Sequence, residues 1–253
     1  MPADVVIMSR EENNEHHDLR SYGRRRGRKF SDRQAALLRD ILPRVAVDLS
    51  APCGLPAKAG INEGESRPLG SPLAGHGAKQ IFLEIGFGGG EHLIWQAAHN
   101  PRVTLIGCEP FEDGVVKVLT RIEDSKLDNI RIHMGDARDV LRALPDASIA
   151  RAFILFPDPW PKRKHQKRRL VNPQTLSLLA RVLKPGAKLR IGTDIGDYAR
   201  TLLLAVTGEP QLRWLADGPG DWRLRPADWP ETRYEAKAAR EGRRRYYFRF
   251  ERV

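Results

Sequence analysis

The chain changes character near residue 80, where short apolar runs begin to alternate with longer segments of helical periodicity. Uninterrupted apolar runs predict strands buried on both faces, and apolar residues spaced three and four apart predict helices. The predicted strands are IFLEIG (81–86), VTLIGCE (103–109), NIRIHMGD (129–136), ARAFILFPDPW (150–160) and KLRIGTD (188–194). The predicted helices are EHLIWQAAHN (91–100), FEDGVVKVLTRIEDS (111–125), VNPQTLSLLARVLKPG (171–186), which Pro-Gly closes, and DYARTLLLAVTG (197–208).

This alternation predicts an α/β fold with a doubly wound, mostly parallel sheet. Two later apolar and aromatic segments, LRWLAD (212–217) and RRYYFRFER (244–252), predict an antiparallel pair at one edge of that sheet near the C-terminus. Residues 80–253 are therefore expected to form one domain.

The first 79 residues show no such alternation. Residues 1–30 mix charges and amides and include the basic segment YGRRRGRK, so we expect a flexible basic arm. Residues 31–79 are expected to hold a helix and a loop. Ser31 is the expected N-cap of that helix, which Pro43 ends. Residues 51–79 are rich in Pro, Gly, Ala and Ser and predict a flexible loop.

The net charge of the chain indicates which class of partner it binds. The 253 residues hold 43 Lys and Arg against 32 Asp and Glu, a net charge of +11. Such an excess favours a polyanionic partner, with nucleic acid first and an anionic membrane surface second. No run approaches the roughly 20 apolar residues of a membrane span, and the N-terminus lacks the order of a signal peptide, so a cytoplasmic protein is expected. With only Cys53 and Cys108, we expect neither a disulfide framework nor a metal.

A glycine-rich segment, EIGFGGG (84–90), lies where the first predicted strand turns into a helix. Gly86 and Gly88 let the backbone approach a ligand at the helix N-terminus. Glu84 stands two residues before Gly86, and a carboxylate there disfavours the pyrophosphate of a dinucleotide. S-adenosylmethionine carries a cationic ammonium and sulfonium group instead. The charge of this segment therefore favours S-adenosylmethionine as the ligand.

Acidic residues end the next two predicted strands. Glu109 follows Gly86 by 23 residues, and its carboxylate can accept hydrogen bonds from both ribose hydroxyls. Asp136 ends the third strand, where it can meet the adenine amine, and Ala137 offers its backbone amide. Because parallel strands end at the same edge of a sheet, these residues predict a nucleoside crevice there.

The segment FPDPWPK (156–162) ends the fourth predicted strand, the usual position of catalytic groups in such sheets. Its prolines restrict the backbone. Asp158 lies between two of them, close to Phe156 and Trp160. A rigid carboxylate beside two aromatic rings is suited to gripping a flat base, so Asp158 is the candidate catalytic residue.

A basic run without any acid follows, from Lys162 to Arg169. Such runs are commonly solvated faces. Its place within a few residues of Asp158 favours a phosphate clamp that delivers a nucleic acid to that residue. The predicted contacts to the RNA backbone are Arg163, Lys164, Lys167, Arg168 and Arg169.

These segments together resemble one family, the bacterial tRNA (guanine-N(7)-)-methyltransferases of class I. The resemblance covers most of residues 80–242. Its motifs are EIGFGGGEHL, GCEPFEDG, GDARDVL, FPDPWPKRKHQKRRLVNP, GTDIGDYA and TRYEAKAAREG. It implies a Rossmann-like sheet and methyl transfer from S-adenosylmethionine to N(7) of a guanosine in tRNA, at position 46 in the variable loop.

The resemblance also assigns residues. It implies that Glu84, Glu109, Asp136 and Asp158 contact the cofactor or its surroundings, and that Asp158 is catalytic. The target nucleoside would lie among Lys162, Asp194, Thr232, Arg233, Tyr234 and Glu235. No obligate protein partner is implied.

Guanine N(7) offers a free lone pair, so the reaction needs alignment and charge stabilisation rather than proton removal. We expect Asp158 to orient guanine through its N–H edge and to favour the developing cation. Asp194 and Glu235 are further candidate acceptors for that edge, and Lys162 is expected to meet a phosphate or ribose.

Other polar and aromatic residues receive structural interpretations. We expect His92, His99 and His133 to be structural, Trp95 to lie in the core, and His165 at most to touch RNA. Trp214, Trp222, Trp229, Tyr246 and Tyr247 are expected in the core of the edge pair, with a stacking surface as the alternative.

Three other functions stay open. A nicotinamide enzyme shares the glycine turn, although Glu84 and the FPDPW segment oppose it. A non-catalytic RNA-binding protein is opposed by the intact strand-end acids. A methyltransferase acting on another RNA is the third.

Overall fold

The computed structural model describes residues 25, 27, 29–49 and 80–253. Within them, seven strands form one sheet in the order β3-β2-β1-β4-β5-β7-β6. Strands β1 to β5 are parallel, and β7 runs antiparallel to β5 and β6. The strands are β1 (Ile81–Ile85), β2 (Thr104–Cys108), β3 (Ile130–His133), β4 (Ile149–Leu155), β5 (Leu183–Thr193), β6 (Leu212–Trp214) and β7 (Tyr246–Arg252). The predicted sheet and its antiparallel edge pair are confirmed.

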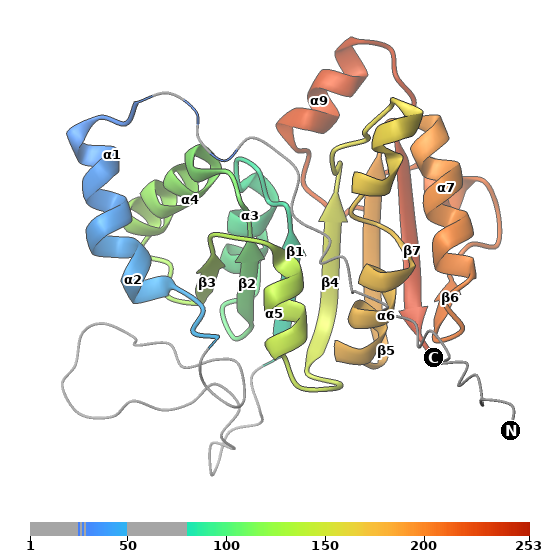
Figure 1. The fold of residues 1–253 in the computed structure, drawn as a ribbon, viewed down its shortest axis with the longest axis horizontal. Helices are drawn as coiled ribbons and strands as arrows, with labels where there is room; N and C mark the ends of the chain where they lie inside the picture. The colour runs from blue at the N-terminus through green and yellow to red at the C-terminus, as the bar shows by residue number, and fades with distance from the viewer. Residues whose placement is uncertain (1–24, 26, 28, 50–79) are drawn as a thin grey trace, which may run out of the picture.

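Helices lie on both faces of this sheet. Figure 1 shows α5, α6 and α7 in front of the sheet and α3 behind it. On β4, Ile154 packs into a cluster with Leu176 of α6, whereas Phe153 packs into a second cluster with Leu93 of α3. Burial on both faces explains why the strand sequences lack polar alternation. The connecting helices are α3 (Glu91–His99), α4 (Glu112–Ser125), α5 (Ala137–Ala143), α6 (Pro173–Val182) and α7 (Gly196–Thr207).

The N-terminal helix begins as predicted and ends later than predicted. Ser31 caps α1 (Asp32–Ala36) in a capping box with Gln34. The helix then passes through a π-helical segment, η1 (Leu37–Ile41), into α2 (Leu42–Val45), so Pro43 does not end it. A proline ring collides with the carbonyl four residues earlier in a regular α-helix, and a wider π-turn just before Pro43 lessens that collision.

A second predicted boundary is wrong at Pro185 and Gly186. Helix α6 ends at Val182, and β5 begins directly at Leu183. Gly186 has a φ of 78°, a left-handed conformation that glycine adopts without strain. The pairing register of β5 with β4 shifts around this position. Pro-Gly therefore marks an irregularity within a strand rather than the end of a helix.

Some elements are too short or too polar for the sequence pattern to reveal. They are α5, α8 (Gly220–Arg223), α9 (Arg233–Arg240) and the 3-10 segment η2 (Arg163–Arg168). No helix in the described ranges is long and apolar enough to cross a membrane. The predicted arm over 1–30 lies almost wholly outside the described residues, and the predicted loop over 51–79 lies wholly outside them.

Candidate active site

A pocket of about 410 Å³ lies at the carboxyl edge of the sheet. Open α/β sheets bind ligands at this edge, and the volume suits a small molecule. Its walls are parts of four segments, 85–88, 108–111, 135–138 and 155–172, together with Tyr234 of α9. The predicted nucleoside crevice and the predicted reactive edge thus share one pocket.

The glycine turn forms one wall. Gly86, Gly88 and Gly90 have φ values of 75°, 54° and 77°, which place all three in the left-handed region where a side chain is disfavoured. The Gly86 amide donates to the Cys108 carbonyl at 2.8 Å and joins the turn to the end of β2. A Cβ atom at Gly88 would lie 3.0 Å from the Tyr234 ring. Glycine at position 88 therefore serves both the turn and the narrowness of the pocket.

Glu109 joins the turn to the start of α4. Its carboxylate accepts hydrogen bonds from the amides of Gly88, at 2.8 Å, and Phe111, at 3.0 Å. Burial raises the pKa of Glu109, and these two hydrogen bonds oppose that rise. Because each carboxylate oxygen keeps a second lone pair, Glu109 can still accept from ligand hydroxyls.

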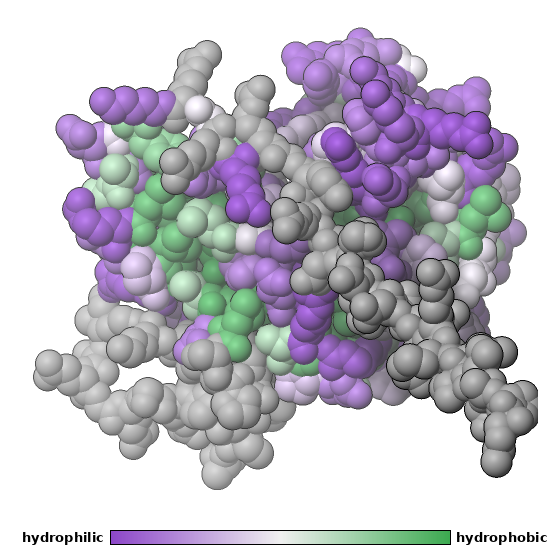
Figure 2. Space-filling view, in the orientation of Figure 1, coloured by the Kyte–Doolittle hydropathy of each residue, from purple (hydrophilic) through white to green (hydrophobic). Residues whose placement is uncertain are grey.

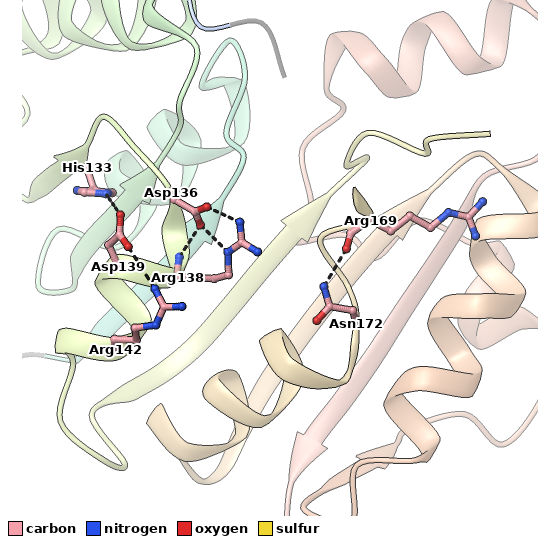
Figure 3. A network of polar contacts seen from close by, with 7 residues as sticks. All are labelled: His133, Asp136, Arg138, Asp139, Arg142, Arg169 and Asn172. Carbon is pink, nitrogen blue, oxygen red and sulfur yellow. Dashed lines mark hydrogen bonds and ion pairs between the residues drawn. The ribbon is translucent and has the colours of Figure 1, made fainter. Parts of the chain in front are cut away.

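Asp136 is the N-cap of α5 and also lines the pocket. Its carboxylate accepts from the Arg138 amide at 3.0 Å and from Arg138 Nε at 2.9 Å (Figure 3). Burial alone would raise the pKa of Asp136, but the hydrogen bonds and charge of Arg138 outweigh it and lower the pKa. Asp136 therefore stays ionised and is held beside Ala137, which also lines the pocket.

Asp158 also lines the pocket, in the loop after β4. Phe156 and Trp160 flank this loop with φ values of 51° and 42°, a strained conformation for large side chains. The Asp158 residue is exposed, yet the protein atoms around its carboxyl partly exclude water, and this burial raises its pKa. No side-chain hydrogen bond or ion pair reaches Asp158 from the described part of the chain.

Arg169, predicted to contact the RNA backbone, lines the pocket but has partners inside the protein. This residue is only 4% exposed. Its guanidinium donates to the Pro159 carbonyl at 2.9 Å, to Thr201 Oγ1 at 2.7 Å and to Asp197 Oδ2 at 2.5 Å. It also lies 4.8 Å from the Tyr198 ring centre. Since its donors serve the protein interior, Arg169 anchors the Asp158 loop to α7.

The rest of the basic run divides between the pocket and the surface. Lys167 and Arg168 line the pocket, and the Arg168 guanidinium stacks over the Trp160 ring at 5.0 Å. Arg163 and Lys164 lie exposed on η2, outside the lining. At the end of the run, Figure 3 shows the Asn172 amide reaching the Arg169 carbonyl, at 3.0 Å, and Asn172 also caps α6.

The structure does not bring Glu84 into the pocket. Its carboxylate is buried and lies 2.7 Å from His92 Nδ1 on α3. Gln96 lies 3.2 Å from the other His92 ring nitrogen and donates to the Asp228 carbonyl. Successive side chains of a strand point to opposite faces, and Glu84 falls on the face that α3 covers. The structural role predicted for His92 is confirmed.

Among the residues predicted for the target nucleoside, Tyr234 alone lines the pocket. Tyr234 is 46% exposed, and the Arg233 guanidinium stacks over its ring at 5.0 Å. Lys162 is exposed outside the lining.

The other three predicted substrate residues have partners within the protein. Asp194 accepts from Arg243 Nε at 2.6 Å. Thr232 is the N-cap of α9 and accepts from the Glu235 amide at 3.2 Å. Glu235 is 2% exposed, burial raises its pKa, and its carboxylate accepts from the Tyr247 hydroxyl. These contacts fix α9 against the end of the sheet.

Some of the aromatic residues predicted to lie in the core are buried there, and others are not. Trp229 and Tyr247 are fully buried in the core, with ring centres 5.4 Å apart. Trp95 is only partly buried and stacks on His99 at 3.9 Å, so its prediction as core is wrong.

Sequence reasoning missed several residues that line the pocket. They include Cys108, Phe111, Arg138, Leu155 and Asn172. The pair Asn172-Pro173, typical of a helix start, is a signal that could have drawn attention to Asn172. The others adjoin predicted residues and have no pattern of their own.

Comparison with known proteins gives concordant results. A family model described as "Putative methyltransferase" matches residues 78–248. The tRNA (guanine-N(7)-)-methyltransferase of Rhodospirillum rubrum is 48% identical over 93% of this chain and 88% of its own. That of Ruegeria pomeroyi is 46% identical over 92% and 94%. The crystal structure of the 16S rRNA methyltransferase KamB shares the fold, with a TM-score of 0.50 and 16% identity over 69% of this chain and 89% of that one.

Proposed function

The chain belongs to the tRNA (guanine-N(7)-)-methyltransferase family, and on that premise we propose that it methylates N(7) of a guanosine in tRNA, using S-adenosylmethionine. The observation that carries the proposal is the shared pocket. Glu109 follows β2, Asp136 follows β3 and Asp158 follows β4, and the cations Lys167 and Arg168 line the same pocket. A tRNA substrate would place the reaction in the cytoplasm.

The residues of the pocket fit S-adenosylmethionine. This cofactor, when bound, would supply a methyl group activated on a sulfonium. Glu109 would hold the ribose hydroxyls with its remaining lone pairs, and Asp136 and Ala137 would lie beside the adenine. Glu109 and Asp158 form no ion pair within the described residues, so their carboxylates are available to the cationic groups of this cofactor.

Asp158 is the residue that we assign to the reaction. Its carboxylate would accept from the N–H edge of guanine and stabilise the positive charge that develops on the purine. The flanking rings of Phe156 and Trp160 would help to exclude water from the base. A carboxylate without a partner in the described chain keeps its acceptor sites for the substrate.

Lys167 and Arg168 would meet the phosphates next to the target guanosine. Both line the same pocket as Asp158, so a nucleotide whose base enters the pocket brings its backbone to them. Arg169 would act indirectly, by holding the loop that carries Asp158.

The test is incubation of the purified chain with radiolabelled S-adenosylmethionine and bulk tRNA, followed by nucleoside analysis. The expected product is labelled 7-methylguanosine, largely lost in Asp158→Asn and retained in Asp124→Asn, an exposed acid on α4. Labelling of another nucleoside or only of another RNA would indicate a different RNA methyltransferase. Binding of tRNA without methyl transfer would favour the non-catalytic alternative.

A further inference from the structure

A row of cations lies along α9. Arg233, Lys237 and Arg240 are spaced by four and three residues, so they share one side of the helix. All three are exposed, whereas Glu235 and Ala238 form the buried side. We call Arg233, Lys237 and Arg240 the α9 stripe.

The α9 stripe begins at the mouth of the pocket. Arg233 stacks over Tyr234, and Tyr234 lines the pocket. Figure 1 shows α9 beyond the carboxyl ends of the strands, and Figure 2 shows hydrophilic residues gathered over that end of the molecule. A nucleic acid that reaches the pocket therefore passes close to the stripe.

The charges of the stripe are only weakly engaged within the protein. Arg233 Nε lies 3.9 Å from Glu91, and Lys237 Nζ lies 3.9 Å from Glu241. Exposed ion pairs at such distances contribute little to stability, so a phosphate group can replace Glu91 or Glu241 as the partner of these cations. Arg240 has no ion pair in the part of the chain that the structure describes.

The spacing of the stripe suits a phosphate backbone. At a rise of about 1.5 Å per residue, Arg233 and Arg240 are about 10 Å apart along the helix. A strand of duplex DNA presents one phosphate for about every 3.4 Å of its axis, and a strand of RNA likewise carries one phosphate per nucleotide. Three cations over this length can face phosphates of a single strand.

We propose that the α9 stripe is a docking surface for the phosphate backbone of the tRNA whose guanosine enters the pocket. It would hold that tRNA together with Lys167 and Arg168 of η2, from a separate element of the fold. This inference rests on the proposed function and adds Lys237 and Arg240 to the RNA-binding surface.

The test compares two double variants with the wild type. Lys237→Gln/Arg240→Gln removes two charges from the stripe, and Lys117→Gln/Arg121→Gln removes two exposed charges one turn apart on α4. The dissociation constant for tRNA is measured at several salt concentrations. The slope of log affinity against log salt should decrease by about 0.7–0.9 for each phosphate that the stripe variant no longer binds, and it should stay unchanged in the α4 variant.

Two further measurements separate RNA docking from folding or catalysis. We expect the stripe variant to raise the KM for tRNA while kcat, the affinity for S-adenosylhomocysteine and the melting temperature stay near wild type. Lys237→Arg/Arg240→Lys should restore the salt slope, because it restores both charges.

Equal salt slopes in the wild type and the stripe variant would overturn the inference. It would also be overturned if the α4 variant lowered the slope by the same amount, or if Lys237→Arg/Arg240→Lys did not restore the wild-type slope. If those slopes are equal while tRNA is still methylated, the inference alone fails. If the slopes differ as expected but the wild type methylates no tRNA, the proposed function fails instead.

Discussion

The carboxylates on the two walls of the pocket differ in the hydrogen bonds that they accept from the protein. On the wall formed by the ends of β1 to β3, Glu109 accepts hydrogen bonds from two backbone amides. Asp136 accepts hydrogen bonds from the backbone amide and the guanidinium of Arg138. On the wall formed by the end of β4, Asp158 has no such partner in the described chain.

This difference suits the first wall to binding the cofactor and the second wall to contacting the target base. The first wall is already ordered around its acids, as a binding site for an invariant cofactor needs to be. The second wall orders only the backbone: prolines flank Asp158, and Arg169 holds the Pro159 carbonyl. Its carboxylate is left available, which suits a residue that must meet an incoming base.

The largest effect is expected from Asp158→Asn. The amide keeps the shape but loses the charge, so turnover should fall on the order of 10²–10³-fold, as when one preorganised electrostatic group is removed. The affinity for S-adenosylhomocysteine should change little. Single-turnover rates and calorimetry on the same preparation measure both quantities.

Near-wild-type turnover in the Asn variant would show that Asp158 only orients the base, because the amide oxygen can still accept from guanine. A lower melting temperature that accompanies the loss of activity would point to a structural role. Asp124→Asn is the control for a surface acid and should leave both quantities unchanged.

The first wall is tested by Glu109→Gln. This substitution replaces one carboxylate oxygen by an NH₂ group, which cannot accept a hydrogen bond. The single remaining oxygen cannot accept from both backbone amides and from the ribose hydroxyls. The affinity for S-adenosylhomocysteine should weaken by roughly 1.5–3 kcal/mol, measured by calorimetry, with Glu123→Gln on α4 as the control. An unchanged dissociation constant would remove Glu109 from the cofactor site.

The first wall was also the more predictable from sequence. Strand-end residues are fixed by topology, since parallel strands that follow one another through helices all end at the same edge. Glu109 and Asp136 therefore line the pocket, as their positions indicate. Glu84 also lies near the end of a strand but does not line the pocket, because its side chain points to the face of the sheet where it meets His92.

The basic run shows where sequence stops being informative. Lys167, Arg168 and Arg169 are consecutive cations that all line the pocket. The first two have exposed or half-exposed side chains, whereas Arg169 is buried and bonded to Thr201 and Asp197. The difference arises from Asp197 and Thr201 on α7, far along the chain. Contacts of this kind follow from tertiary packing and leave no local pattern.

Arg169 and Lys167 offer a sharper test of the second wall. Arg169→Lys keeps the charge but loses part of the planar hydrogen-bonding fork, so the free energy of unfolding should fall by about 1–2 kcal/mol, with the salt slope for tRNA unchanged. Lys167→Gln should do the opposite: an unchanged melting temperature and a salt slope lower by about 0.7–0.9. A reduced slope in Arg169→Lys without destabilisation would restore Arg169 to the RNA surface.

The smallest expected effect concerns pH. Burial raises the pKa of Asp158, so its carboxylate should begin to take up protons at a higher pH than the usual value of about 3.9 for Asp. If the ionised form is the active one, the single-turnover rate should fall as the pH drops through this raised pKa. Asp158→Asn should lack that acidic limb and show a flatter profile.

Stability should respond with the opposite sign, which separates loss of activity from acid unfolding. A carboxyl with a raised pKa in the folded state binds protons more readily there than in the unfolded chain. Its contribution to stability is therefore fully present below the unfolded pKa and is lost as the pH rises through the folded pKa. Relative to Asp158→Asn, the wild type should gain stability toward acid while its rate declines. Thermal melts and rates across the same pH series test this, and an acidic limb identical in both proteins would exclude Asp158 as its source.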